Sequence, residues 1–170
     1  MSDQHEIADL MPLSVAYIGY ARAVIRLRLA VEGARPEEDG IVVLATATEA
    51  LFWACAVAEN LDHDDPTYDQ ADKYGKSVVQ GARWARNQAT HQLAFVVADA
   101  GGNGLSRVVW RPVDQLPEER QERAAQRKQY RANLEGKPIL DTFATISGFF
   151  ASEQLRVGSL LQRATGSESI

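Results

Sequence analysis

The sequence predicts a mainly α-helical protein, a bundle of three or four long helices with an inserted β-hairpin and polar helix. Apolar residues recur every three or four positions over long stretches. Segments containing Gly or Pro separate these stretches. Only the region between residues 93 and 110 changes to the short β-prone runs typical of a hairpin. At 170 residues, one domain spanning residues 1–170 is expected.

Two helices are expected in the first part of the chain. The first covers residues 9–31 and ends at the Gly- and Pro-containing segment 33–36. Its expected core stripe is Leu10, Ser14, Ile18, Ala21, Ile25 and Leu29, with Val15 and Val24 beside it. The second begins after the acidic residues 37–39, which suit the positive end of the helix dipole, and ends near Leu61. Its expected stripe is Ile41, Leu44, Thr48, Leu51, Cys55 and Ala58.

A third helix is expected from residue 67 or 69 to residue 91, with a core stripe of Val78, Ala82, Ala85 and Ala89. Residues 93–137 form the expected insertion. It comprises strands at 93–97 and 107–110, followed by a mostly exposed polar helix at 118–134. A last amphipathic helix starts at Ile139, and its expected apolar positions are Phe143, Ile146, Phe150, Leu155, Val157 and Leu161.

Composition excludes several classes of protein. The formal net charge of −5 argues against a domain that coats nucleic acid by bulk charge, although a local basic site stays open. The single cysteine, Cys55, excludes an internal disulfide and a cysteine-based zinc site. The longest apolar run, residues 51–58, is much shorter than the roughly 20 residues of a membrane span. The first residues also lack a signal-peptide pattern, so a cytoplasmic protein without a membrane partner is expected.

Neither a metal nor another cofactor is expected. The acidic segment 62–65 contains one histidine, but contiguous ligands in a loop do not have the spacing of a closed metal site.

One row of polar residues on the third helix is a candidate site. If Ala85 faces the core, Asn87 and His91 share a face four residues apart, and Arg83 precedes Asn87 by the same interval. This row is expected to lie away from the alanine stripe, with Arg86 on its flank.

These residue types suit metal-free cleavage of RNA. A neutral imidazole can take a proton from a ribose 2′-hydroxyl near pH 7. A guanidinium can hold a phosphate by two hydrogen bonds and stabilise the charge that grows on it. The Asn side chain can fix an oxygen or orient a neighbouring group.

The segment 86–91, Arg-Asn-Gln-Ala-Thr-His, resembles the R-x4–6-H motif of HEPN domains, in which a polar residue often follows the arginine. The resemblance covers residues 9–91 and 138–163. It implies a HEPN-like helical bundle, with Arg86 and His91 as catalytic residues and Asn87 as their polar support. It also implies a homodimer in which two motifs meet to form one ribonuclease site. Many HEPN nucleases carry a tyrosine two residues after the histidine, where this chain has Leu93.

Three functions stay open at this point. The first is a metal-independent endoribonuclease, acting as a toxin with a cognate antitoxin, in defence or in RNA processing, with Arg83 binding substrate. The second is a non-catalytic HEPN-like module that binds nucleotides or a protein and dimerises. The third is an unrelated helical protein, in which Arg83 and Arg86 are solvated or pair with Glu49 or an acidic loop, and His91 interacts with the helix dipole.

Overall fold

The structure, a computed structural model, describes residues 2–33, 40–91, 96–100, 108–117 and 123–166. Of residues 2–9 and 91, only the backbone is described. The elements in chain order are α1 (Ser2–Gly33), α2 (Gly40–Asp64), the 3-10 helix η1 (Tyr68–Gln70), α3 (Lys73–His91), β1 (Val97–Asp99), β2 (Val108–Trp110), the 3-10 helix η3 (Val113–Gln115), α4 (Ala124–Asn133), α5 (Ile139–Leu155) and α6 (Leu160–Gly166).

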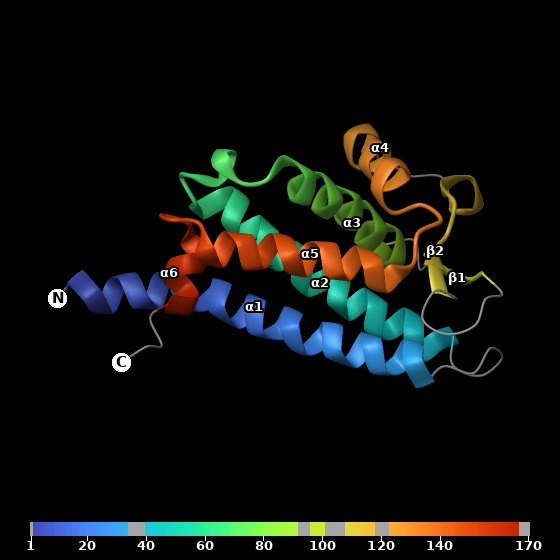
Figure 1. The fold of residues 1–170 in the computed structure, drawn as a ribbon, viewed down its shortest axis with the longest axis horizontal. Coiled ribbons are helices and arrows are strands. Elements are labelled where there is room, and N and C mark those ends of the chain that lie inside the picture. Colours follow the sequence, from blue (N-terminus) through green and yellow to red (C-terminus); the bar gives the residue numbers. More distant parts are fainter. Residues whose placement is uncertain (1, 34–39, 92–95, 101–107, 118–122, 167–170) are drawn as a thin grey trace.

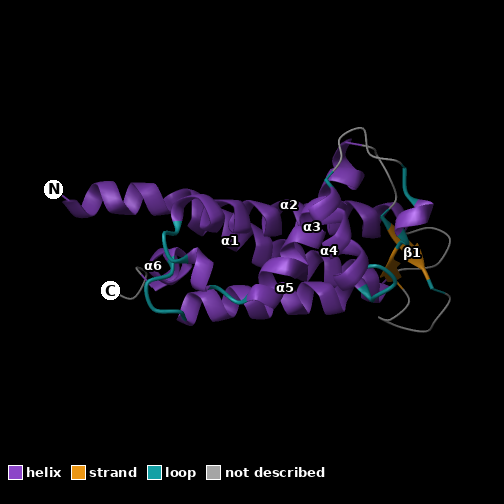
Figure 2. Ribbon diagram, turned by 90° about the horizontal axis from the view of Figure 1, so that it is seen from above, coloured by secondary structure: helices purple, strands orange, loops and turns teal. Residues whose placement is uncertain are grey.

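Four long helices, α1, α2, α3 and α5, form the body of the protein (Figure 1). The short helix α6 packs on α1 and α5 at the end opposite the hairpin. Helix α4 packs on α3 (Figure 2). The rings of Trp84 and Tyr130 lie 4.5 Å apart between centroids in this contact. The mainly helical fold with one small antiparallel hairpin is therefore confirmed.

Helix α1 buries a different face from the one expected. Its buried residues are Leu10, Leu13, Ala16, Tyr20, Ala23, Leu27 and Val31. Ile18, Ala21, Ile25 and Leu29 from the expected stripe are exposed, so the prediction is wrong at these positions, whereas Leu10 is buried and Ser14 is half-buried. The helix has two apolar stripes on opposite sides, and both have helical spacing. The buried one includes Tyr20, whose hydroxyl donates a hydrogen bond to the Phe143 carbonyl (3.1 Å).

The core stripes of the next two helices agree better with expectation. On α2, Leu51, Cys55 and Ala58 are buried, whereas Ile41 is exposed. On α3, the whole expected stripe of Val78, Ala82, Ala85 and Ala89 is buried. Small side chains there allow neighbouring helices to approach α3 closely.

The hairpin is short and sits against the start of α5. Strands β1 and β2 are antiparallel, and Val97 pairs with Trp110. Most of the expected first strand, residues 93–95, lies outside the described residues, and β1 begins at the last residue of that run. The buried Trp110 indole donates from Nε1 to Thr142 Oγ1 of α5 (2.8 Å). This bond fixes the insertion to the bundle.

The described part of the expected polar helix is α4, and residues 118–122 lie outside the described part of the chain. Most of α4 is exposed or half-buried, as expected. Tyr130 is the exception: it is buried, and its hydroxyl donates to the Arg111 carbonyl (2.6 Å). That contact explains how so polar a helix stays attached to α3 and the hairpin.

The last helix is not continuous, which corrects the expectation of one long helix. It breaks between α5 and α6, where Gly158 has a positive φ of 83° that glycine adopts without a steric penalty. Leu155 and Val157, which were expected in the core, are 81% and 87% exposed at this break. The backbone N–H of Leu160 at the start of α6 donates to Asp65 Oδ2 (3.0 Å).

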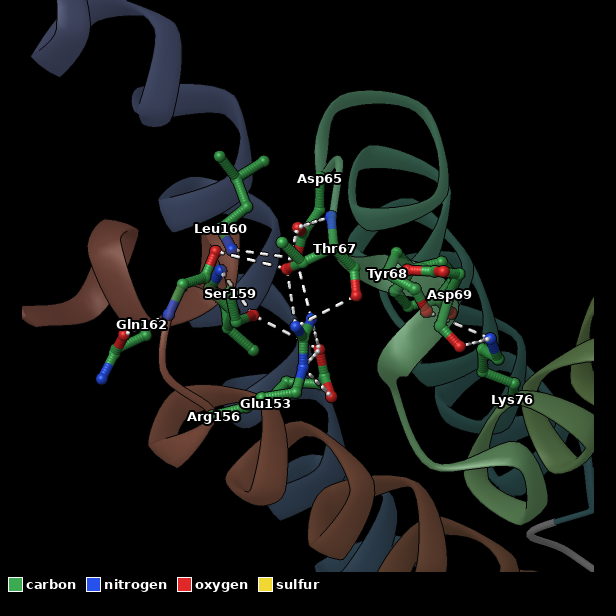
Figure 3. Close-up of polar contacts among 12 residues, drawn as sticks. Asp65, Thr67, Tyr68, Asp69, Lys76, Glu153, Arg156, Ser159, Leu160 and Gln162 are labelled. Carbon is green, nitrogen blue, oxygen red and sulfur yellow. Dashed lines mark hydrogen bonds and ion pairs between the residues drawn. The ribbon is translucent and has the colours of Figure 1, made fainter.

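A buried ionic cluster holds this break in place (Figure 3). Arg156 Nη2 donates to Asp65 Oδ2 at 2.9 Å and to Glu153 Oε2 at 2.6 Å. Its Nη1 also donates to Thr67 Oγ1 at 2.6 Å. The two carboxylates are buried, and Ser159 donates to Glu153 as well. The cluster therefore ties the end of α2 to both α5 and α6.

Two helical stretches have the length and mean hydropathy of a membrane span, residues 10–33 of α1 and 40–64 of α2. A core helix of a soluble protein passes the same test, so this is weak evidence about location. Cytoplasmic location stays a prediction.

Candidate functional site

Arg86 lies between α3 and α2, near the C-terminal end of α3. Its Nη1 donates a hydrogen bond to Glu59 Oε1 of α2 at 3.0 Å, and its Nη2 donates to Asn87 Oδ1 at 3.4 Å. The side chain of Arg86 is 23% exposed and that of Glu59 is 48% exposed. The guanidinium is therefore held in one orientation while part of it still faces solvent.

Asn87 is only 6% exposed, so the expected polar row is not an open face. Its Nδ2 lies 3.5 Å from Gln126 Oε1 of α4, at the limit of a hydrogen bond. The prediction that this row faces away from packed surfaces is wrong at Asn87, because α4 covers that side of α3. Asn87 can still orient Arg86, which it touches, but it is poorly placed to meet a large ligand.

Arg83 lies one turn before Arg86, on the same side as α2. Its Nη1 is 3.5 Å from Asp62 Oδ2, and its side chain is only 11% exposed. Asp62 belongs to the acidic segment that the sequence offered as a partner. The other partner considered, Glu49, pairs with Arg26 instead. Arg83 is thus less accessible to a substrate than Arg86.

His91 is the last residue of α3, and its side chain lies outside the described residues. It follows Arg86 by five positions, a rise of about 7.5 Å along a helix axis. Thr90 Oγ1 donates to the Arg86 carbonyl (2.8 Å), so the backbone of the motif is helical up to this end. The structure therefore places Arg86 and Asn87 together, whereas it leaves the position of the imidazole a prediction.

Two further polar groups near the motif lack partners among the described residues. Both side-chain atoms of Gln88 are buried without a hydrogen bond, and so is Trp84 Nε1, one turn earlier on the same face. Cys55 is also close to the arginines, but burial raises the pKa of its thiol to about 12. Cys55 is therefore inert as a nucleophile at neutral pH.

A metal centre is not evident in the described part of the chain, where no three His, Cys, Asp or Glu side chains group closely.

The chemistry of the site depends on the guanidinium of Arg86. A partly exposed guanidinium can hold a phosphate oxygen and stabilise negative charge that develops there. Glu59 competes for that guanidinium, yet its own carboxylate is half exposed, and such a solvent-screened pair contributes about 1 kcal/mol, so a phosphate can displace it.

The role of Glu59 as the partner of Arg86 was not predicted from the sequence. The spacing along α2 could have indicated that Glu59 lies near the core, because Glu59 follows Cys55 by four residues and so lies beside the core stripe. Pairing it with Arg86, which is 27 positions later, required knowing how α2 and α3 pack. The Arg156 cluster was missed for the same reason.

Comparison with known proteins gives no relative on which to base a function. The chain matches no protein-family model, and searches of curated proteins and of solved structures found no significant match.

Proposed function

We propose that this chain is a metal-independent, HEPN-type endoribonuclease that acts on RNA in the cytoplasm as a toxin, in defence or in RNA processing. The observation that carries the proposal is the Arg86 guanidinium, held between Glu59 and Asn87 and partly open to solvent. It lies five residues before His91 in a segment that resembles the R-x4–6-H motif.

In the proposed reaction, the ribose 2′-oxygen attacks the adjacent phosphorus and the bond from phosphorus to the 5′-oxygen breaks. His91 accepts the 2′-hydroxyl proton, and an acid returns a proton to the leaving 5′-oxygen. The products are a 2′,3′-cyclic phosphate and a 5′-hydroxyl. Arg86 stabilises the negative charge on the pentacoordinate phosphorus, and Asn87 holds the guanidinium in place. A homodimer carries two copies of this site, one from each protomer.

A test compares RNA cleavage by the wild type, Arg86→Ala and His91→Ala with a chelator present. Arg28→Ala is a matched control, because Arg28 is an exposed arginine on α1, away from the site. We expect a loss of at least 100-fold for both site variants, the scale seen when a charge-stabilising donor or a general base is removed, and no change for the control. Equal cleavage by all four proteins, or none by the wild type on varied RNAs, contradicts the proposal.

Two observations favour a second function, a HEPN-like module that binds nucleotides or a protein partner without cleavage. Asn87 is covered by α4, and Glu59 already neutralises Arg86. Such a module needs Arg86 for a phosphate but has no use for His91. Nucleotide binding measured by calorimetry separates the two functions, because the module binds with unchanged affinity after His91→Ala and shows no turnover.

A further inference from the structure

The outer side of the α1–α2 hairpin carries large apolar side chains that no described residue covers. Each is about half exposed or more, between 45% and 72%. Together they are Met11, Val15, Ile18, Ile25, Leu29, Ile41, Val42 and Phe52. We call this surface the α1–α2 apolar face.

The residues of the two helices belong to one continuous surface. The exposed ion pair between Arg26 and Glu49 joins α1 to α2. Leu29 follows Arg26 by three residues, and Phe52 follows Glu49 by three, so each is a surface neighbour of the pair. Farther along, the Trp53 ring packs on Gly19, where a Cβ would lie 2.6 Å from Trp53 Cδ2. The hairpin is therefore tight, and its two helices present one outer surface, which the Arg26–Glu49 pair crosses.

The size of the face points to a protein partner. A half-exposed large apolar side chain offers on the order of 100 Å². The eight together offer roughly 800 Å² of apolar surface, with the Arg26–Glu49 pair and Arg22 lying among them. About 800 Å² per partner is also what a stable protein interface buries.

The spacing on α1 points to another helix as the occupant. The exposed stripe of α1 consists of Met11, Val15, Ile18, Arg22, Ile25 and Leu29. Successive members are four, three, four, three and four positions apart. This is the spacing of a coiled-coil seam.

The same stripe is symmetric about Tyr20. Ile18 and Arg22 are equally far from it, as are Val15 and Ile25, and Met11 and Leu29. A two-fold interface needs this symmetry, because residue i meets residue j and j meets i. Antiparallel pairing sets Met11 against Leu29 and Val15 against Ile25. It also sets Arg22 against Ile18, where the arginine stem covers the seam and its charge reaches the rim. Parallel pairing would instead set Arg22 against its own copy.

We infer that a second copy of this chain docks on the α1–α2 apolar face, with α1 antiparallel to α1 and α2 antiparallel to α2. The two-fold axis crosses α1 at Tyr20. The Gly19–Trp53 contact places Phe52 of α2 beside that level, so the two Phe52 rings meet near the axis.

This arrangement extends the proposed function, on which its consequence for catalysis rests. Phe52 and Glu59 are seven residues apart, so they share a face of α2 at a separation of about 10 Å. A two-fold axis that crosses both α1 and α2 leaves the two α3 helices on the same side of the dimer. The two Arg86–Glu59 pairs then open along one edge of the interface, about 10 Å either side of the axis. One RNA strand can reach both.

The first test is the oligomeric state in solution. Sedimentation of the wild type is expected to give a dimer at micromolar concentration, and Ile25→Glu/Leu29→Glu a monomer. The matched control is Leu155→Glu/Val157→Glu, which changes two exposed apolar residues outside the face and is expected to stay dimeric. A monomeric wild type overturns the inference, as does a monomer that instead binds phosphatidylglycerol vesicles through this face.

The second test is disulfide mapping, which does not require a charged substitution to fold. Met11→Cys and Leu29→Cys are each expected to form no intermolecular disulfide alone, because each lies opposite the other residue. An equimolar mixture is expected to cross-link. Cys55 is buried and gives no background. Self-linking of either variant alone, or no linking in the mixture, overturns the antiparallel register.

The two proposals can fail separately. A dimer with the mapped disulfide that cleaves no RNA leaves the interface standing and refutes the nuclease. A monomer that cleaves RNA, with the activity lost in His91→Ala, keeps the nuclease and refutes the interface.

Discussion

Arg86 of α3 donates a hydrogen bond to Glu59 of α2 at 3.0 Å, at a point where both side chains still reach solvent. The pair fixes the guanidinium and at the same time neutralises it. A phosphate that binds Arg86 must therefore displace a carboxylate. Glu59 thus orients the guanidinium and also weakens phosphate binding to it.

Removing the negative charge of Glu59 is expected to strengthen RNA binding. Glu59→Gln keeps the side-chain shape and an oxygen acceptor but removes the charge. Because so exposed a pair contributes at most about 1 kcal/mol, the gain in RNA affinity is expected to be up to about 5-fold, with a loss of stability below 1 kcal/mol. Fluorescence anisotropy with labelled single-stranded RNA measures it. Glu49→Gln, which breaks the Arg26 pair, is the matched control and is expected to change nothing. Equal effects of both variants would show that only net charge matters.

The Arg156 cluster is expected to dominate stability at the α5–α6 break. Arg156→Ala leaves two buried carboxylates, Asp65 and Glu153, without their cation. Such a loss costs about 3–5 kcal/mol, which denaturant unfolding measures. Arg131→Ala is the control, because Arg131 is largely exposed and its contact with Glu135 is long, at 3.7 Å. Its expected cost is below about 1 kcal/mol. A similar small cost for Arg156→Ala would mean that the carboxylates find other partners.

The same cluster predicts how stability changes with pH. Burial alone would raise the pKa of Asp65, but hydrogen bonds from Leu160 and Thr67 and the charge of Arg156 outweigh it and lower the pKa. A lowered folded-state pKa means that the stabilisation is complete above the unfolded value of about 3.9 and is lost as pH falls through the folded value. Unfolding free energy is therefore expected to fall below about pH 4. Asp65→Asn should flatten that fall, and an unchanged slope in this variant would contradict the assignment.

A side chain at Gly19 is expected to lower the stability of the protein. A Cβ there would lie 2.6 Å from the Trp53 ring, so Gly19→Ala is expected to cost about 1–3 kcal/mol by forcing Trp53 aside. Gly148 of α5 is the matched control, since a Cβ there meets nothing within 4 Å. Gly148→Ala is expected to stabilise the protein by about 0.5–1 kcal/mol through helix propensity. The melting temperatures of both variants test this prediction. A shift in the same direction for both variants would contradict it.

Local patterns in the sequence predicted much of this fold. The four long helices and the alanine stripe of α3 follow from helical spacing interrupted by Gly and Pro, signals that lie within each segment. The buried face of α1 could not be predicted in this way, because α1 has two apolar stripes and spacing alone does not show which one is buried. The buried stripe is the one with Tyr20, whose hydroxyl reaches Phe143 far along the chain.

The candidate site was predictable only in part, for a related reason. Arg86 and Asn87 are neighbours in sequence, and the structure places them in contact. The burial of Asn87 depends on α4, and the anchoring of Arg86 depends on Glu59, so both reflect packing between helices. The break before α6 likewise depends on Asp65, which lies 95 positions before Leu160.

The most direct test of the central claim is the chemical nature of the RNA ends after cleavage. Attack by the 2′-oxygen predicts a 2′,3′-cyclic phosphate and a 5′-hydroxyl, seen by mass spectrometry of a short defined RNA in the presence of chelator. It also predicts no cleavage of the same RNA with a 2′-deoxyribose at the cut position, and none by His91→Ala. A 3′-hydroxyl product, cleavage of the deoxy-substituted RNA, or full activity without His91 would contradict the account.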